Sequence, residues 1–214
     1  MKIQKTLILI ALTLLVLPVP SQAKSTKNNK VFFRGGLSSL TGNRGGEVFT
    51  DTLSTTTTND GKLGFNVAAG LDLGLTARNA LWDGASLAGE VMVEFSRFSA
   101  NQVTQTTSAL LGGTATSKVA ITELNVGINP KLKIDKFGAI RPYVIPVGLA
   151  FLVSSPPSND STYLDFGLNF AAGVDFEITE IICLGLDARY THGFEINNTK
   201  TSYFSTGASL GVLF

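Results

Sequence analysis

Apolar and polar residues alternate one by one through most of this 214-residue chain. The segment 62–76 is the clearest case. Each odd position from Leu63 to Leu75 is apolar, and the even positions are small or polar, with a carboxylate at Asp72. A period of two over this length predicts a β-strand with one apolar face, whereas a helix would repeat its apolar residues every 3.6 positions.

The alternation recurs in eight segments, two of them less regular. They are 30–40, 62–76, 86–98, 118–134, 139–153, 163–178, 182–194 and 201–214. Most hold ten or more residues, which is about the length of a strand that crosses a membrane and longer than the usual five or six residues. Within 139–153, Pro142 and Pro146 predict a bulge or irregular pairing, because proline has no N–H to donate to a neighbouring strand.

The connections between these segments also follow an order. Four are long or polar, namely 40–61, 100–117, 154–162 and 195–200, and those between them, 77–85, 135–138 and 179–181, are mostly shorter. Long loops at one end and short turns at the other are typical of outer-membrane barrels.

The first 23 residues have the pattern of a secretory signal peptide. Two lysines precede the apolar stretch 6–17, two prolines end it, and the small residues Ser21 and Ala23 provide a cleavage site. An uncleaved anchor helix is the alternative, but the stretch is short for a membrane span. We therefore predict a signal peptide at 1–23 and one folded domain at 24–214.

Composition narrows the class of protein further. Only 15% of the residues are charged, against about 25% in an ordinary soluble domain. The 17 basic and 16 acidic residues nearly balance, which argues against nucleic-acid binding. Cys183 is the only cysteine, so an internal disulfide is excluded.

Two folds could use such strands. A soluble sandwich would hide the apolar faces and expose the other faces, which should then carry more charge than they do. In a lipid-embedded barrel the apolar faces meet hydrocarbon, small and polar side chains fill the interior, and closure leaves no unpaired strand edge. We therefore predict an all-β fold, an eight-stranded antiparallel transmembrane up-and-down β-barrel. The aromatic residues expected in its two interfacial girdles are Phe33, Trp82, Phe98, Phe137, Tyr143, Phe151, Tyr163, Tyr190, Phe194 and Phe214.

These features, with the final segment 207–214, resemble the bacterial outer-membrane β-barrels of the small OmpA/OmpX-like class. Segment 186–193 is similar to the penultimate strand of its porin-like and PorT-like members. Phe214, with Val212 and Leu210 alternating before it, resembles the signal read by the barrel-assembly machinery. The resemblance implies an outer-membrane location, lipid and that machinery as partners, a monomer and no cofactor. The chain departs from OmpA-type proteins in one respect, because it stops at the last strand, and we therefore expect no periplasmic peptidoglycan-binding domain and no cell-wall tether.

The faces opposite the apolar ones carry the charges predicted to line the lumen. These residues are Arg34, Asp72, Glu90, Glu94, Glu123, Lys131, Asp165, Asp175, Asp187 and Arg189. Buried charges need partners, so the simplest interpretation is a set of ion pairs that plugs the barrel.

Counting residues from the strand ends places Arg189 near Glu94 and Glu123, and Arg34 lower, near Asp72 or Glu90. Since three bases face seven acids, an alternative is a cation-preferring path that opens when the pairs of Arg189 rearrange.

An enzyme is the main alternative of another class, because some eight-stranded barrels modify lipid A with a His, a Ser and a carboxylate. The only histidine is His192, with Glu195 and Ser205 nearby in the sequence, but parity places His192 on the lipid side. No metal or phosphate-binding motif is present. We therefore predict a non-enzymatic barrel that acts in envelope integrity or in surface interaction through polar loops at 41–60 and 101–117.

Overall fold

The computed structural model describes residues 29–41, 63–82, 84–98, 101–104, 116–119, 122–155, 163–194 and 201–214. The predicted signal peptide lies outside these residues. The described strands are β1 (Lys30–Leu40), β2 (Leu63–Gly74), β3 (Ala85–Phe98), β4 (Asn101–Thr104), β5 (Thr116–Val119), β6 (Thr122–Ile134), β7 (Ile140–Ser155), β8 (Tyr163–Glu177), β9 (Ile182–Gly193) and β10 (Tyr203–Leu213). The described residues contain no helix that is long and apolar enough to span a membrane.

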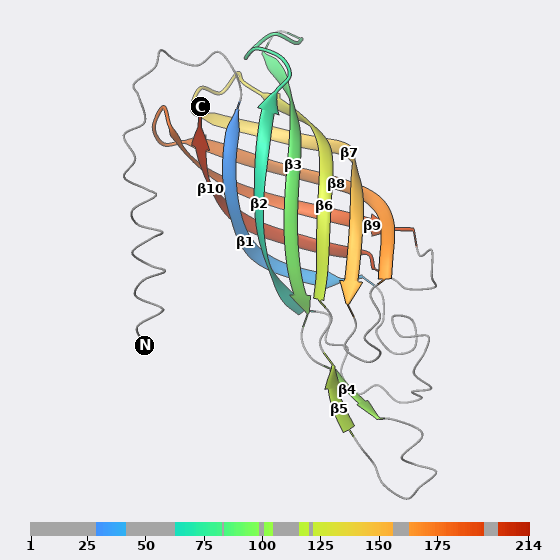
Figure 1. The fold of residues 1–214 in the computed structure, drawn as a ribbon. Helices are drawn as coiled ribbons and strands as arrows, with labels where there is room; N and C mark the ends of the chain where they lie inside the picture. Colours follow the sequence, from blue (N-terminus) through green and yellow to red (C-terminus); the bar gives the residue numbers. More distant parts are fainter. Residues whose placement is uncertain are drawn as a thin grey trace, which may run out of the picture.

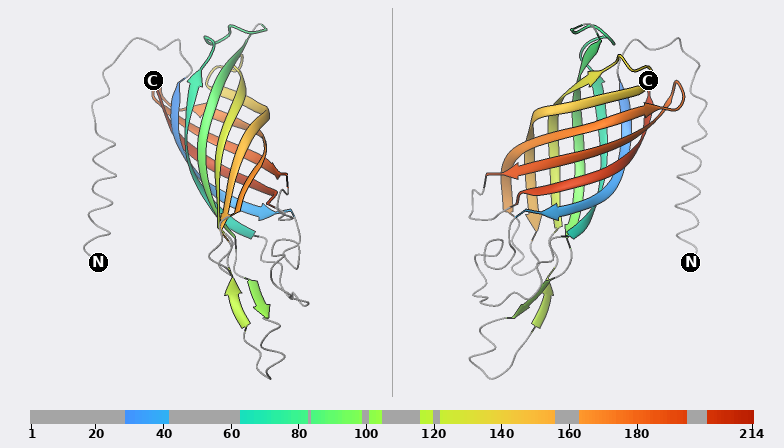
Figure 2. Two further views of the ribbon diagram at one scale, coloured as in Figure 1. Left: turned by 45° about the vertical axis from the view of Figure 1, so that its right-hand side comes forward. Right: turned by 180° about the vertical axis from the view of Figure 1, so that it is seen from behind.

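Eight of the strands form one closed barrel in the order β1-β10-β9-β8-β7-β6-β3-β2 (Figures 1 and 2). Neighbouring strands are antiparallel, and the first strand pairs with the last from Lys30 opposite Leu213 to Leu40 opposite Tyr203. The predicted eight-stranded up-and-down barrel is confirmed.

The two ends of the barrel differ in the lengths of their connections. At the end where the C-terminus lies, the strands are joined by 75–84, 135–139 and 178–181. At the other end they are joined by 41–62, 99–121, 156–162 and 194–202. Short turns mark the periplasmic end of an outer-membrane barrel and long loops its outer end, so we refer to the two ends by these names.

The strand predicted at 118–134 is divided in the structure. Its first part belongs to β5, which pairs with β4 in a separate two-stranded sheet, and the barrel strand β6 begins only at Thr122. Figure 2 shows this β4–β5 ribbon beyond the outer end of the barrel. The prediction of one continuous strand was wrong because alternation alone does not show where a strand changes its pairing partner.

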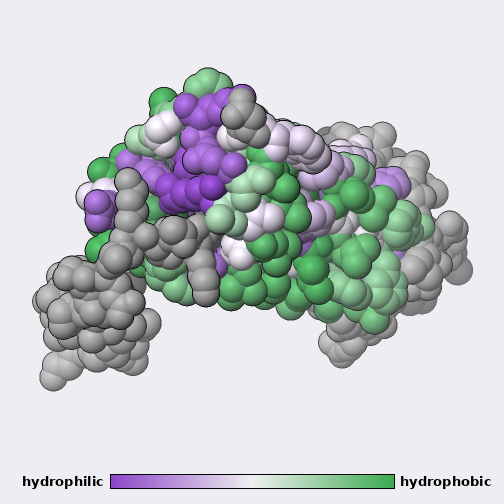
Figure 3. Space-filling view, turned by 90° about the horizontal axis from the view of Figure 1, so that it is seen from above, coloured by the Kyte–Doolittle hydropathy of each residue, from purple (hydrophilic) through white to green (hydrophobic). Residues whose placement is uncertain are grey.

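Side chains alternate between the lumen and the outer surface of the barrel. From Glu90 to Phe98 in β3, the even positions are buried and the odd ones exposed. The outer surface carries large apolar side chains, including Phe33 at 67% exposure and Leu186 at 55%. Figure 3, seen from the periplasmic end, shows this apolar side wall in green and polar residues gathered at the barrel end. A polar interior with an apolar exterior is suited to a lipid surrounding.

β7 contains the irregularity that its prolines predict. Its pairing with β6 shifts between Ile128 and Leu132, and its pairing with β8 shifts between Ile145 and Gly148. Pro146 and the residue after it both point outward, so the alternation changes phase there.

The change of phase corrects one predicted face. Tyr143, expected in an aromatic girdle on the lipid side, is 6% exposed, and Ile145 on the same face of β7 is 1% exposed, so both lie in the lumen. Tyr143 is therefore not a girdle residue, and neither is Phe98, which is buried against Tyr203 with the ring centroids 6.0 Å apart. The other predicted girdle residues whose side chains the structure describes are exposed or half-buried.

Candidate functional site

The lumen is filled by charged side chains from most strands of the barrel. The structure places all ten predicted side chains inside it, and each is no more than 6% exposed. Two further lumen bases, Lys30 and Lys133, are also buried. The sequence carried a signal for both, because Lys30 shares its parity with Arg34, and Lys133 shares its parity with Lys131. The count of three bases against seven acids is therefore wrong, because five bases face the seven acids even before Arg141 at the periplasmic rim is added.

Arg34 on β1 occupies the middle of the lumen. Its Nη1 donates hydrogen bonds to Glu94 Oε2 at 2.8 Å and to Asn66 Oδ1 at 2.6 Å, and its Nε donates to Asp187 Oδ1 at 2.7 Å. Its Nη2 lies 3.3 Å from the hydroxyl of Ser205 on β10. One guanidinium thus joins four strands of the barrel wall.

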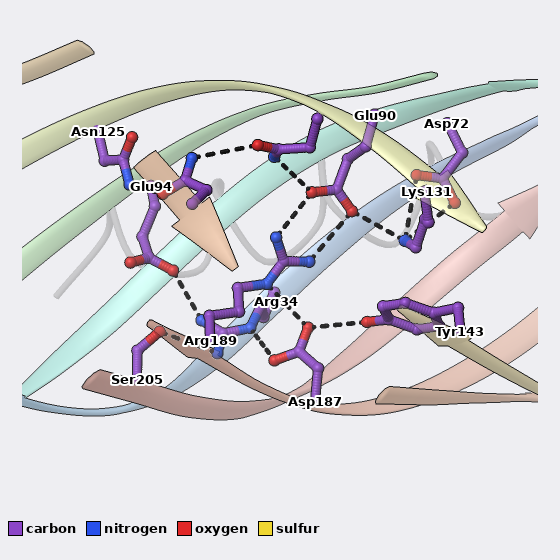
Figure 4. Close-up of polar contacts among 12 residues, drawn as sticks. Arg34, Asp72, Glu90, Glu94, Asn125, Lys131, Tyr143, Asp187, Arg189 and Ser205 are labelled. Carbon is purple, nitrogen blue, oxygen red and sulfur yellow. Dashed lines mark hydrogen bonds and ion pairs between the residues drawn. The ribbon is translucent and has the colours of Figure 1, made fainter. Parts of the chain in front are cut away.

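Arg189 on β9 forms the second half of the same network. Its Nη1 and Nη2 donate to the two carboxylate oxygens of Glu90 at 2.7 and 3.1 Å, and its Nε donates to Asp187 Oδ2 at 3.1 Å. Asp187 therefore accepts from both arginines, and the Tyr143 hydroxyl also donates to it at 3.1 Å. Figure 4 shows the two arginines meeting at Asp187. We call Arg34, Arg189, Asp187, Glu90 and Glu94 the arginine bridge.

The partners of the two arginines are the reverse of those predicted. Arg34 pairs with Glu94, and Arg189 pairs with Glu90. Counting from strand ends ignored the tilt and stagger of strands in a barrel. In the observed register Arg34 lies opposite Ala68, and Ala68 lies opposite Glu94, which puts Arg34 and Glu94 on one line across the strands.

A lysine cluster lies on the periplasmic side of the arginine bridge. Lys30, Lys131 and Lys133 have their Nζ atoms 3.7, 3.2 and 2.8 Å from Asp72 Oδ2. Lys30 also donates to Asp175 at 2.7 and 2.9 Å. Lys131 further pairs with Glu90 and lies 4.0 Å from the ring centroid of Tyr143, so this cluster is continuous with the bridge.

Arg141 lies at the periplasmic rim of the lumen. It was not predicted there from the sequence, because the bulge in β7 reverses which of the residues before Pro146 face inward. Its guanidinium pairs with Asp135 at 2.6 Å and with Glu177 at 3.1 Å, and Arg78 pairs with Glu177 at 2.7 Å. Burial alone would raise the pKa of Asp135, but its hydrogen bond with Ser86 and the nearby Arg141 charge help to hold that pKa below its ordinary value.

Two of the predicted acids have no base among their partners in the described residues. Asp165 accepts hydrogen bonds from the Thr201 hydroxyl at 3.0 Å and from the Phe166 N–H at 2.8 Å. Glu123 on β6 has a buried Oε1 atom without any hydrogen-bond partner in the described structure. Both acids lie in the outer part of the lumen, whereas the other five acids are paired with Lys or Arg.

The three residues of the predicted assembly signal lie on the outer surface at the periplasmic end. Leu210, Val212 and Phe214 are 47%, 46% and 52% exposed. They alternate with residues that face the lumen, so they form an apolar outward face at the end of the last strand.

The predicted catalytic candidates do not form a triad in the described residues. His192 faces outward, but Ser205 is buried in the lumen against Arg34, so these two side chains lie on opposite faces of the wall. His192 Nδ1 instead lies 3.4 Å from the Oγ of Ser202, a buried hydroxyl that accepts a hydrogen bond from the Gly193 N–H. Glu195 lies outside the described residues.

Comparison with protein families gives one match over nearly the whole chain. The model of the outer membrane protein β-barrel domain matches residues 9–214. No curated protein matches this chain.

Solved structures with a similar fold are outer-membrane barrels of low sequence identity. The outer membrane protein OprG from Pseudomonas aeruginosa is 13% identical, with a TM-score of 0.50 over 90% of this chain and 99% of OprG. Neisserial surface protein A is 14% identical, with a TM-score of 0.49 over 89% of this chain and 98% of that one. The outer membrane enzyme PagL is 12% identical, with a TM-score of 0.49 over 86% of this chain and 99% of PagL. The similarity to OprG concerns the fold alone.

Proposed function

This chain belongs to the family of outer membrane protein β-barrel domains, and from that premise we propose that it is a closed, non-enzymatic anchor for surface-exposed segments. The family places it in the bacterial outer membrane, with lipid around its apolar exterior. We further propose that Phe214, Val212 and Leu210 are the signal by which the barrel-assembly machinery recognises it.

The observation that carries the proposal is the arginine bridge. Its ion pairs run from Glu94 on β3 through Arg34 on β1 to Asp187 and Arg189 on β9, and return to Glu90 on β3; each of these side chains is almost fully buried. β3 and β9 lie on opposite sides of the closed barrel, so these pairs cross the lumen. An ion that crossed the lumen would have to separate these pairs and leave buried charges without partners, which costs several kcal/mol. The network therefore favours a closed barrel over the cation path.

The outer end supports a role at the surface. The four connections there include the β4–β5 ribbon, and their sequences are rich in Thr, Ser and Asn without a catalytic constellation. A rigid barrel that holds such segments in place is a common arrangement for surface interaction. Their composition does not identify a ligand.

Bilayer conductance tests the closed lumen. We expect the purified, refolded protein to leave the current across a planar lipid bilayer at its background level, because the arginine bridge blocks the lumen. A trimeric or larger porin incorporated into the same bilayer serves as the positive control. Reproducible single-channel steps from the wild-type protein would contradict the closed barrel and restore the gate hypothesis.

Epitope labelling of intact cells tests the surface role. We expect an epitope inserted at 105–115 to be stained on intact cells, because β4 and β5, which flank this segment in the sequence, lie beyond the outer end. The same epitope inserted after Gly138, in a short turn at the opposite end, is the matched control and should be stained only after the outer membrane is permeabilised. The reverse result would overturn the orientation and with it the proposed surface function.

A further inference from the structure

Among the described residues, the lumen acids are paired with bases everywhere except near the outer end. The five lumen acids of the arginine bridge and the lysine cluster face five bases, but Glu123 and Asp165 have no Lys or Arg partner among the described residues. The charged groups that act most strongly on Glu123 are Glu94 and Asp165, both acids. Among the described residues, this part of the lumen therefore holds acids without a paired base.

Three oxygen atoms in the same place lack hydrogen-bond partners in the described structure. They are Glu123 Oε1, Asn125 Oδ1 and Ser154 Oγ, from side chains whose residues are 2%, 1% and 4% exposed. The Ser154 hydroxyl is close enough to act on Glu123, but the two groups do not meet in a hydrogen bond of ordinary geometry. Buried polar atoms are normally satisfied, so two acceptor oxygens beside a hydroxyl, all without partners, indicate that a ligand for these oxygens is missing.

The strand register makes the residues that carry these oxygen atoms neighbours on the lumen face. Glu123 and Asn125 are two residues apart on the lumen face of β6, and Ser154 on β7 lies directly opposite Glu123. Asn125 lies opposite Leu152, which in turn lies opposite Asp165 on β8. We call Glu123, Asn125, Ser154 and Asp165 the outer oxygen cluster.

We propose that the outer oxygen cluster binds a small hard cation, with Ca²⁺ as the best fit. Its donors are carboxylate, amide and hydroxyl oxygens, the atoms that Ca²⁺ takes as ligands in flexible geometry. A cation of charge +2 would also balance the negative charge of the two carboxylates that bind it.

The number of charged ligands in the cluster determines its affinity for the cation. Among the described residues no three His, Cys, Asp or Glu side chains come together as a metal-binding group. The site thus has two carboxylates, and water must complete the coordination. We expect exchangeable binding with a dissociation constant of about 10⁻⁴–10⁻³ M, as in weakly charged extracellular calcium sites.

The cluster lies at the outer end of the lumen. Glu123 is the second residue of β6 from the outer end, and Ser154 is the second-last residue of β7. A cation arriving from the outer side meets this cluster before it meets Arg34. Binding is therefore compatible with a lumen that does not conduct.

Thermal unfolding of the full-length protein in detergent micelles tests the site. At 10 mM CaCl₂, against EDTA at matched ionic strength, we expect the midpoint of the heat-induced gel shift to rise by about 3–8 °C. Mg²⁺ should raise it less, because that ion dehydrates reluctantly and demands octahedral geometry. Titration calorimetry with CaCl₂ should give one site per chain.

Two neutralising variants make the test specific. Glu123→Gln should lose the calcium-dependent rise, and Glu180→Gln, an exposed acid in the turn 178–181, should keep it. If Glu123→Gln does not refold, Asp165→Asn is used and should reduce the rise at least twofold. No rise in the wild type, or an equal rise in both neutralising variants, would overturn the proposal.

Discussion

Replacement of Arg34 by Met is expected to lower the free energy of unfolding by about 3–5 kcal/mol. Methionine keeps much of the length of the side chain but removes the charge and all of its donors. Glu94 and Asp187 then lose their ion pairs with this guanidinium inside the lumen, and Asn66 loses a hydrogen bond of 2.6 Å. Removing one partner of a buried ion pair is costly because the other charge stays buried. Urea titration of the folded form in detergent, followed by its gel mobility without boiling, measures the change.

Arg97→Met is the matched control for this prediction. Arg97 lies on β3 and faces the outer surface, so the same chemical change should alter the free energy of unfolding by no more than about 0.5 kcal/mol. Equal losses in the two variants would mean that the arginine bridge contributes no more than a surface charge does, and the closed-lumen proposal would lose its physical basis.

Gly36→Ala is expected to impair closure of the barrel and to cost about 3 kcal/mol, the upper range for overpacking. Gly36 lies opposite Gly207, where the first and last strands meet. A methyl group there would overlap the backbone carbonyl oxygen of Thr206 and lie 2.6 Å from the Cα of Gly207. These are backbone atoms, so β1 and β10 would have to separate, and unpaired strand edges cannot be tolerated in lipid.

The adjacent glycine provides the control for this variant. A methyl group at Gly35 would have Asn66 O as its nearest neighbour, at 4.0 Å, which is an ordinary contact. Gly35→Ala should therefore keep the heat-modifiable folded form in amounts close to the wild type, and Gly36→Ala should lose a large part of it. Equal yields and midpoints for both variants would show that the two strands do not approach as closely as described.

The barrel itself could be predicted from the sequence because the features that specify each strand, its alternation and its length, lie within that strand. Period-two alternation assigns each residue of a strand such as β3 to one face, and the length of the strand separates a membrane span from a soluble sheet. The division of 118–134 into β5 and β6 could not be predicted, because a strand keeps its alternation when it changes partner. The reversed face at Tyr143 has a similar cause, since prolines signal that a bulge exists but not where the phase changes.

The lumen could be predicted as a set of residues but not as a set of pairs. All ten predicted side chains point inward, yet Arg34 and Arg189 have each other's expected partners. Which charges meet depends on strand tilt and on side chains that reach across the interior, such as Arg189 to Glu90. Neither is encoded in the spacing of residues along one strand.

The ladder between β1 and β10 joins residues from the two ends of the domain, with Lys30 opposite Leu213. No partial chain can complete that ladder, so the contacts that seal the barrel have the greatest sequence separation of any strand pairing among the described residues. Folding of such a topology is slow, because the entropy of a very long loop is lost before any pairing offsets it. The polypeptide must therefore stay unfolded, and protected from aggregation, until its last strand has been made and delivered.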